Sequence, residues 1–295
     1  MVSRDSPAAE VEITAELVRT LLQEQHSDLA GDDLTFLAEG WDNVQFRLGN
    51  DLIVRLPRRK LAVRLIEHEQ RWLPELVERL PLPIPCPVRI GRPGATFSWP
   101  WSIVPWVQGR DAISAPVGDT RRTGELLGVF LRALHQPAPD DAPHNPHRGV
   151  PIEDRADRDG PVLERLITGG IAPDAVMTIW DEARAAPAFA GPPVWLHGDA
   201  HAGNMVVRDG LIVSMIDWGD ITSGDPASDL VGLWMVLDPA GRAVARAELG
   251  YDDPTWTRAR GWAVLMGAML LANSDDRPQY RRLGQHTIAE VLASS

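Results

Sequence analysis

Side chains that can bind a cation or accept a proton gather between residues 194 and 229. His197, Asp199 and Asn204 follow the spacing H-x-D-x-x-x-x-N, and Asp217 comes after two apolar runs. Carboxylate and amide oxygens without thiolates suit Mg²⁺, which proteins usually hold with one or two carboxylates together with substrate phosphates. We therefore expect Asn204 and Asp217 to be metal ligands, which leaves Asp199 to accept the proton of a hydroxyl group.

A tight hairpin is expected to position these groups. The apolar runs 205–208 and 211–216 flank Asp209-Gly210, a dipeptide typical of a two-residue turn between two strands. If these two residues form the turn, position 208 pairs with position 211, and this pairing fixes the register of the whole hairpin.

That register predicts which side chains meet at the open end of the hairpin. Asn204 then faces Met215, and Asp217 lies diagonally two positions further on. Diagonal neighbours on one face are about 7 to 8 Å apart, near enough for an amide oxygen and a carboxylate to hold one cation. Asp199 lies at the same end, so we expect Asp199, Asn204 and Asp217 to form one cluster.

The N-terminal part of the chain predicts a helix followed by an antiparallel meander. Apolar residues at helical spacing end at the turn 31–33, and three strand-like runs follow at 34–38, 44–48 and 52–56. Further along, Asp119 is expected to cap a helix that ends at His135.

One acidic residue stands on the apolar stripe of the helix predicted over 62–80. Glu69 occupies this stripe, and Pro74 is expected to kink or divide the helix. A carboxylate directed at the core is unfavourable unless it is paired. We therefore expect an ion pair with Arg55 on the preceding strand.

Composition excludes several classes of protein. The 295 residues include 29 Lys+Arg and 41 Asp+Glu, a net charge of −12, which disfavours sequence-independent binding to nucleic acid. The single cysteine, Cys86, excludes an internal disulfide and zinc sites that need two thiolates. Residues 1–10 lack the apolar stretch of a signal peptide, and no apolar segment is long enough to span a bilayer. We expect a cytoplasmic protein that binds neither nucleic acid nor membranes; its oligomeric state does not follow from the sequence.

Three motifs in order closely resemble those of the aminoglycoside phosphotransferase family, which has the protein-kinase-like fold. They are H-G-D-x-H-x-x-N at 197–204, I-D-W at 216–218 and G-D-P-x-x-D at 224–229. The resemblance implies an α+β fold with a small antiparallel-sheet N-terminal nucleotide-binding lobe (1–104), a hinge (105–110) and a larger, mainly helical catalytic lobe (111–295). It also implies that Asp199 acts as the catalytic base, that Asn204 and Asp217 hold Mg²⁺, and that His197 locks the loop by hydrogen bonding. Asp225 and Asp229 are expected to cap a helix and to brace the loop, respectively.

The same resemblance assigns a set of nucleotide-binding residues. Arg55 takes the place of the usual lysine of the third strand, with Glu69 as its helix partner, and a guanidinium can bind two phosphate oxygens at once. The loop 39–43 is implied to cover the phosphates, and the base is implied to bond to the backbone of the hinge. The full set is Gly40, Asn43, Arg55, Glu69, the carbonyl of Pro105 and the amide of Val107. The phosphate donor is implied to be ATP or GTP.

The resemblance implies a small hydroxylated acceptor, and an antibiotic such as an aminoglycoside is the first expectation, with antibiotic resistance as the role. Acidic residues in the second lobe would suit a cationic acceptor, although such residues often belong to solvated helix faces: Glu153, Asp154, Asp157, Asp159, Asp238, Asp252 and Asp253. The alternative in the same fold is a kinase of a metabolite alcohol such as choline or a sugar derivative.

Two alternatives from other classes stay open. His197, Asp199, His201 and Asp217 also fit a two-metal phosphoesterase, which would need no nucleotide. A nucleotide-binding pseudokinase that serves as an interaction module is the other, although the intact set of Asp199, Asn204 and Asp217 argues against it.

Overall fold

The structure is a computed structural model in which residues 7–294 are described, so part of the N-terminal stretch 1–10 lies outside the described residues. The chain divides into two compact units. The first runs to Arg79 and includes Ile84–Gln108, and the second consists of Leu80–Pro83 and the chain from Gly109 onward. Within residues 7–294, no helix combines the length and the apolar character needed to cross a bilayer.

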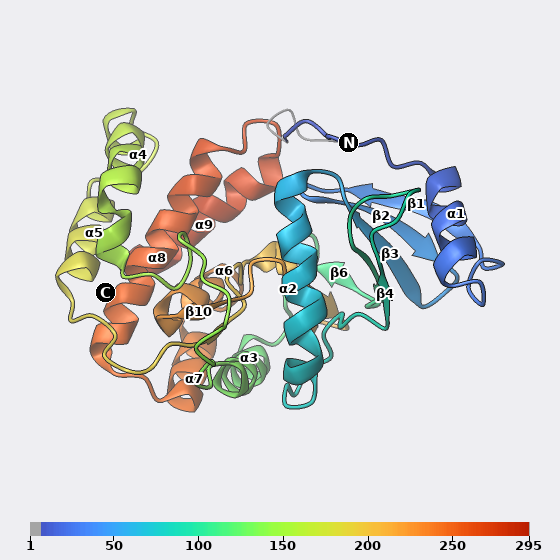
Figure 1. The fold of residues 1–295 in the computed structure, drawn as a ribbon. Helices are drawn as coiled ribbons and strands as arrows, with labels where there is room; N and C mark the ends of the chain where they lie inside the picture. The colour runs from blue at the N-terminus through green and yellow to red at the C-terminus, as the bar shows by residue number, and fades with distance from the viewer. Residues whose placement is uncertain (1–6, 295) are drawn as a thin grey trace. The chain divides into compact units, whose positions relative to one another are not determined.

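The first unit is built on a five-stranded antiparallel sheet in the order β1-β2-β3-β5-β4 (Figure 1). The meander predicted from the sequence is confirmed as β1 to β3. The elements of this unit are α1 (Ala15–Gln25), β1 (Leu34–Glu39), β2 (Asn43–Leu48), β3 (Leu52–Pro57), α2 (Lys60–Val77), β4 (Arg89–Gly91) and β5 (Trp101–Pro105).

The alternation of side chains along β3 separates the two faces of this sheet. Val54 and Leu56 belong to the apolar core that also contains Leu21 and Leu22 of α1. Arg55 points to the opposite face, where α2 lies along the sheet (Figure 1). One strand thus provides both the packing of α1 and a buried cation beside α2.

Helix α2 is a single helix, so the expectation that Pro74 divides it is wrong. Pro74 lies inside Lys60–Val77, close to the C-terminal end of the helix. A proline removes one backbone donor, but the buried stripe that includes Glu69, Trp72, Leu73 and Leu76 continues past it. Packing of this stripe therefore stabilises the helix on both sides of Pro74.

The second unit is mainly helical and holds two small sheets, β6-β8-β9 and β10-β7. Helix α3 packs against α7, and α8 packs against α5 and α9 (Figure 1). The helices are α3 (Thr120–Leu134), α4 (Ala156–Thr168), α5 (Ala175–Ala185), α6 (Gly232–Val236), α7 (Pro239–Leu249), α8 (Asp253–Ala272) and α9 (Pro278–Ala293). The strands and short 3₁₀ helices are β6 (Arg110–Asp111), β7 (Val194–Leu196), β8 (Met205–Arg208), β9 (Leu211–Met215), β10 (Thr222–Gly224), η1 (Ile152–Arg155), η2 (Ala202–Asn204) and η3 (Pro226–Val231).

The predicted N-cap of α3 is confirmed. The side chain of Asp119 accepts the backbone N–H of Arg122 at 2.9 Å, and the helix ends at Leu134, one residue before His135. Such a cap satisfies a backbone donor that has no partner within the helix.

The hairpin β8-β9 has the predicted turn but not the predicted register. Asp209 and Gly210 have φ values of 54° and 78°, as a type I′ turn requires, and Arg208 pairs with Leu211. A β-bulge then shifts the register, so that Met205, not Asn204, pairs with Met215. A bulge adds one residue to one strand, and nothing in the apolar pattern of 211–216 signals it.

Candidate active site

The loop that carries Asp199 is anchored by a buried carboxylate. Asp229 of η3 accepts the backbone N–H of His197 at 2.6 Å and that of Gly198 at 2.9 Å, and its side chain is 1% exposed. Ionised carboxylates form strong hydrogen bonds to backbone donors. Asp229 therefore braces the loop, as expected.

At Gly198 the backbone leaves no room for a side chain. Its φ of +83° lies in the left-handed region, and an added Cβ would collide with the backbone carbonyl of Asp220. The loop and the segment after β9 are consequently in close contact, which brings Asp199 near Asp220.

His197 connects the same two segments through both ring nitrogens. Its Nδ1 accepts the backbone N–H of Asp199 at 3.2 Å, and its Nε2 donates to the carbonyl of Ile216 at 3.0 Å. This pattern requires the neutral tautomer with the proton on Nε2. Burial lowers the pKa of His197 despite the nearby carboxylates of Asp229 and Asp199. These contacts suit a residue that holds the loop rather than one that transfers a proton.

Asp199 is surrounded by donors. Its Oδ1 accepts from Arg148 at 3.0 Å, and its Oδ2 lies 3.3 Å from Nε2 of His201 and 3.2 Å from Nδ2 of Asn204. Burial by itself would raise the pKa of Asp199, but His201 and Arg148 together lower the pKa below its ordinary value. The side chain remains 23% exposed, so an ionised carboxylate is accessible at this position.

Asn204 lies across the hairpin from Ile216, the residue before Asp217, and not from Met215 as predicted. The backbone N–H of Ile216 donates to the carbonyl of Asn204 at 2.8 Å, so Asn204 and Asp217 both lie at the open end of the hairpin. Asp217 is exposed and has a φ of 61°, a conformation that is uncommon for a residue other than glycine. Backbone strain of this kind often marks functional sites.

The donor set fits a hard cation such as Mg²⁺. Because Nδ2 of Asn204 donates to the backbone carbonyl of Asp199 at 2.9 Å and to its carboxylate, the amide oxygen of Asn204 is directed away from Asp199. An amide oxygen and the Asp217 carboxylate are ligands of the kind that hold Mg²⁺ jointly with phosphate oxygens. Within the described residues, no three His, Cys, Asp or Glu side chains are arranged to hold a metal ion by themselves.

Three residues of this cluster are absent from the predicted site. Arg148 and His201 bond to Asp199, and Asp220 lies close enough that Asp199 contributes to its pKa, which burial raises to about 6. From the sequence, His201 is expected only as a metal ligand of a phosphoesterase. Arg148 lies in a loop without regular periodicity, so only the three-dimensional structure shows where its side chain points.

The first unit contains the predicted ion pair between Arg55 and Glu69. Nη1 of Arg55 lies 2.9 Å from both carboxylate oxygens of Glu69, and the two side chains are 6% and 1% exposed. Register explains the encounter, because Arg55 lies opposite Ser102 of β5 on the α2 face of the sheet. Its role in nucleotide binding stays a prediction.

The loop between β1 and β2 is a closed turn. The N–H of Gly40 donates to the carbonyl of Asn43 at 2.8 Å, and Arg58 donates to the carbonyl of Gly40 at 3.2 Å. Asn43 is buried, and its side-chain oxygen has no hydrogen-bond partner among residues 7–294. The contact of Gly40 and Asn43 with phosphate remains a prediction.

The predicted base-binding positions follow the end of β5. Pro105 pairs with Leu52 of β3, and the N–H of Trp106 donates to the carbonyl of Asp51 at 2.7 Å. These bonds fix the chain on both sides of Pro105. The contacts proposed for Pro105 and Val107 remain predictions.

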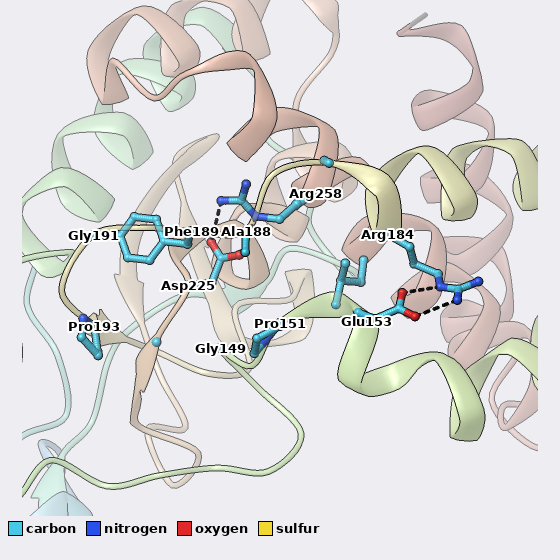
Figure 2. Close-up of a pocket in the computed structure, with 13 residues that line it drawn as sticks. Gly149, Pro151, Glu153, Arg184, Ala188, Phe189, Gly191, Pro193, Asp225 and Arg258 are labelled. Atoms are coloured by element: carbon cyan, nitrogen blue, oxygen red, sulfur yellow. Dashed lines mark hydrogen bonds and ion pairs between the residues drawn. The ribbon is translucent and has the colours of Figure 1, made fainter.

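A cavity of about 210 Å³ lies within the second unit (Figure 2). Its wall includes Asp225, which accepts from Nε of Arg258 at 2.6 Å and also caps η3 by accepting the N–H of Ala227 at 3.0 Å, as expected for Asp225. At its edge Glu153 and Arg184 form a second ion pair. Asp199 is not among the lining residues, so this cavity is distinct from the Asp199 cluster.

A comparison with protein families identifies the family of this chain. Residues 33–262 match the model of the phosphotransferase enzyme family APH, and the chain therefore belongs to this family. No curated protein matches the sequence.

Solved structures show the same fold at low sequence identity. The chain is similar to the GDP complex of aminoglycoside 2'-phosphotransferase-IIIa, with a TM-score of 0.70, 18% identity and coverage of 96% of this chain and 99% of that chain. It is also similar to the streptomycin-ATP-APH(2")-IIa ternary complex, with a TM-score of 0.59, 20% identity and coverage of 96% and 97%. The macrolide 2'-phosphotransferase MphH from Brachybacterium faecium has a TM-score of 0.58, 19% identity and coverage of 92% and 98%. The predicted kinase-like α+β fold and the prediction of a phosphotransferase are confirmed.

Proposed function

We propose that the protein transfers the γ-phosphate of ATP or GTP to a hydroxyl group of a small molecule. The observation that carries this proposal is the geometry at the open end of the β8-β9 hairpin. There an accessible carboxylate, Asp199, is bonded to the amide nitrogen of Asn204, and the amide oxygen of Asn204 is left for a cation next to Asp217. Phosphoryl transfer requires a group that orients the hydroxyl and a metal site that holds the phosphates.

Each residue of the cluster has a separate task in the proposed reaction. Asp199 accepts the proton of the acceptor hydroxyl while the oxygen of that hydroxyl forms a bond to the γ-phosphorus. The bond from this phosphorus to the β-γ bridging oxygen breaks, and its electron pair leaves with the nucleoside diphosphate. Mg²⁺, when bound by Asn204 and Asp217, would neutralise charge on the phosphate oxygens. His197 and Asp229 keep the loop in place.

The nucleotide proposal rests on the first unit and on the similar structures. Arg55 would bind the phosphates, with Glu69 fixing its guanidinium, and Pro105 and Val107 would bind the base through their backbones. The similar structures include complexes with GDP, ATP and ADP. Both purine nucleotides are therefore included in the proposal.

Similarity to aminoglycoside and macrolide phosphotransferases favours an antibiotic acceptor. A specific observation favours the second candidate, a kinase of a metabolite alcohol or sugar derivative. Most acidic residues expected to attract a polycation already have structural partners: Glu153 binds Arg184, Asp159 binds Arg155, Asp253 binds Arg246, and Asp238 and Asp252 cap α7 and α8. Five of the seven acidic residues expected to attract a cationic acceptor therefore already interact with groups of the protein itself.

The alternatives from other classes receive less support. A two-metal phosphoesterase needs several protein ligands, whereas both ring nitrogens of His197 are bonded to the backbone. A pseudokinase would not require the accessible carboxylate of Asp199 beside Asn204 and Asp217.

The test is acceptor-dependent release of nucleoside diphosphate by the wild type and by Asp199→Asn. Loss of a general base lowers the rate by about 100- to 10,000-fold, and we expect such a loss in kcat with Mg·ATP or Mg·GTP binding retained. Asp209→Asn is the matched control, since Asp209 is exposed at the turn of the same hairpin and Asn adopts its backbone conformation readily. Near-native turnover of Asp199→Asn would overturn the proposal.

A further inference from the structure

Arg148 is bonded directly to the proposed catalytic base, and the proposed reaction gives it no task. Its Nη2 donates to Oδ1 of Asp199 at 3.0 Å, and the two side chains are 24% and 23% exposed. Because the acceptor hydroxyl must approach the same carboxylate, Arg148 lies where an acceptor binds. Any role of Arg148 toward an acceptor rests on the proposed function.

The segment 145–149 is held rigidly, so the position of Arg148 is built into the fold. The N–H of Asn145 donates to Oγ1 of Thr222 at 2.9 Å, and the N–H of Gly149 donates to the hydroxyl of Ser228 at 3.2 Å. The carbonyl of Gly149 accepts the N–H of Asp225 at 2.8 Å. Gly149 itself has a φ of +67° and no room for a Cβ beside Leu196, so glycine is required at this turn.

The hydrogen bonds of Asp199 show which oxygen an acceptor can use. A carboxylate offers two lone pairs on each oxygen. Oδ2 already receives two donors, from His201 and Asn204, whereas Oδ1 receives one, from Arg148. An incoming hydroxyl therefore donates to Oδ1. Two groups bonded to one oxygen lie about 4 to 5 Å apart, so this hydroxyl is adjacent to the guanidinium.

The chemistry of the guanidinium limits what can stand beside the reacting hydroxyl. An arginine side chain has five N–H donors and no acceptor, and it keeps its charge. A neighbouring group with lone pairs, such as a second hydroxyl, can accept from the donors that do not bind Asp199. A protonated amine in the same place offers only donors and a like charge.

We propose that Arg148 determines acceptor specificity, and that it selects a polyol with a hydroxyl on the carbon next to the one that is phosphorylated over an acceptor with an ammonium group there. This assignment favours a sugar or cyclitol derivative as the substrate class. The proposed selection by Arg148 applies only to the group on the carbon next to the reacting hydroxyl. It does not apply to charged groups further away on the acceptor.

The experiment compares pairs of acceptors with similar rings, in which one member is a polyol and the other carries amino groups in place of hydroxyl groups. Initial rates with Mg·ATP and Mg·GTP are measured for D-glucose against D-glucosamine and for myo-inositol against 2-deoxystreptamine, with kanamycin and streptomycin as polycationic acceptors. The proteins are the wild type, Arg148→Gln, which removes the charge, and Arg148→Lys, which keeps it. Arg158→Gln is the matched control, because Arg158 binds Asp159 and His147 in the same region but does not bond to Asp199.

We expect the wild type to prefer the polyol of a pair by about tenfold or more in kcat/KM, as for a site that selects by hydrogen bonding. Arg148→Gln should bring the two members of the pair to similar values, mainly by raising KM for the polyol, while Arg148→Lys and Arg158→Gln keep the preference. Thermal denaturation of each variant checks folding, and the retained preference of Arg148→Lys separates the effect of charge from a loss of structure.

Two failures are distinguishable. Turnover with a preference that Arg148→Gln leaves unchanged, or a wild type that prefers the amino compounds, overturns the assignment of Arg148 and leaves the phosphotransferase proposal standing. Absence of acceptor-dependent turnover with every compound, in a protein that binds Mg·ATP or Mg·GTP, counts against the proposed function and removes the assignment with it.

Discussion

Asn204 donates its side-chain amide to Asp199 twice, to the backbone carbonyl at 2.9 Å and to the carboxylate at 3.2 Å. These bonds fix the orientation of the amide, so that its oxygen is directed away from the proposed base. One side chain thus keeps Asp199 in place, and in the proposed function its oxygen would be a ligand of Mg²⁺ together with Asp217.

The metal requirement should therefore depend on Asn204. In Asn204→Ala we expect the Mg²⁺ concentration for half-maximal activity to rise by about 10- to 100-fold, because one ligand and the support of Asp199 are lost together. Addition of EDTA should abolish turnover in the wild type, and excess Mg²⁺ should restore it. The measurement is initial rate against Mg²⁺ concentration at saturating nucleotide. An unchanged Mg²⁺ dependence in Asn204→Ala would remove Asn204 from the metal site.

The buried carboxylate of Asp229 should matter for stability as well as for activity. In Asp229→Asn the amide group cannot accept both backbone N–H groups of His197 and Gly198, and one donor is left buried without a partner. We expect a loss of about 2 to 4 kcal/mol in the free energy of unfolding, because hydrogen bonds to charged groups contribute strongly. Urea denaturation measures this loss. Asp154→Asn, at an exposed site on η1, is the control and should change stability little.

The sequence predicts contacts between neighbouring segments better than contacts between distant loops. The pairing of Arg55 with Glu69 follows from one strand and the next helix, and the cap at Asp119 from a single turn. Arg148 and Asp199 meet because the segment 145–149 packs on β10 and η3, which no local pattern specifies. The shifted register at Asn204 has a similar cause, since a bulge depends on packing around the strand.

Arg55 and Glu69 offer a test of a buried ion pair. Removal of either partner, in Arg55→Met or Glu69→Met, should lower the free energy of unfolding by about 3 to 5 kcal/mol, because the other charge is left buried. The double variant should lose much less than the sum of the two. The exposed pair Arg122 and Glu125 on α3 is the matched control, and an equivalent cycle there should give a coupling below about 1 kcal/mol. Additive losses at 55 and 69 would contradict a direct pair.

Asp220 carries a partly accessible carboxyl group with a raised pKa. Burial raises its pKa from 3.8 to about 6, and the carboxylate of Asp199 adds to the rise, whereas Arg148 and the hydrogen bond from Asn145 oppose it. The folded protein therefore retains a proton on Asp220 over a range of pH in which the unfolded chain has lost it.

This difference should make stability fall as pH rises between about 4 and 6. In that window the folded state binds more protons than the unfolded state, so the free energy of unfolding decreases with pH. Asp220→Asn keeps an acceptor for Asn145 but carries no charge, so its stability relative to the wild type should increase across the window and stay constant above about pH 6. The gain should reach at most about 3 kcal/mol, since one pKa unit corresponds to about 1.4 kcal/mol. Thermal denaturation from pH 4 to pH 8 measures the difference, with Asp154→Asn as the control. Parallel curves for the wild type and Asp220→Asn would show that this carboxyl group does not titrate in the window.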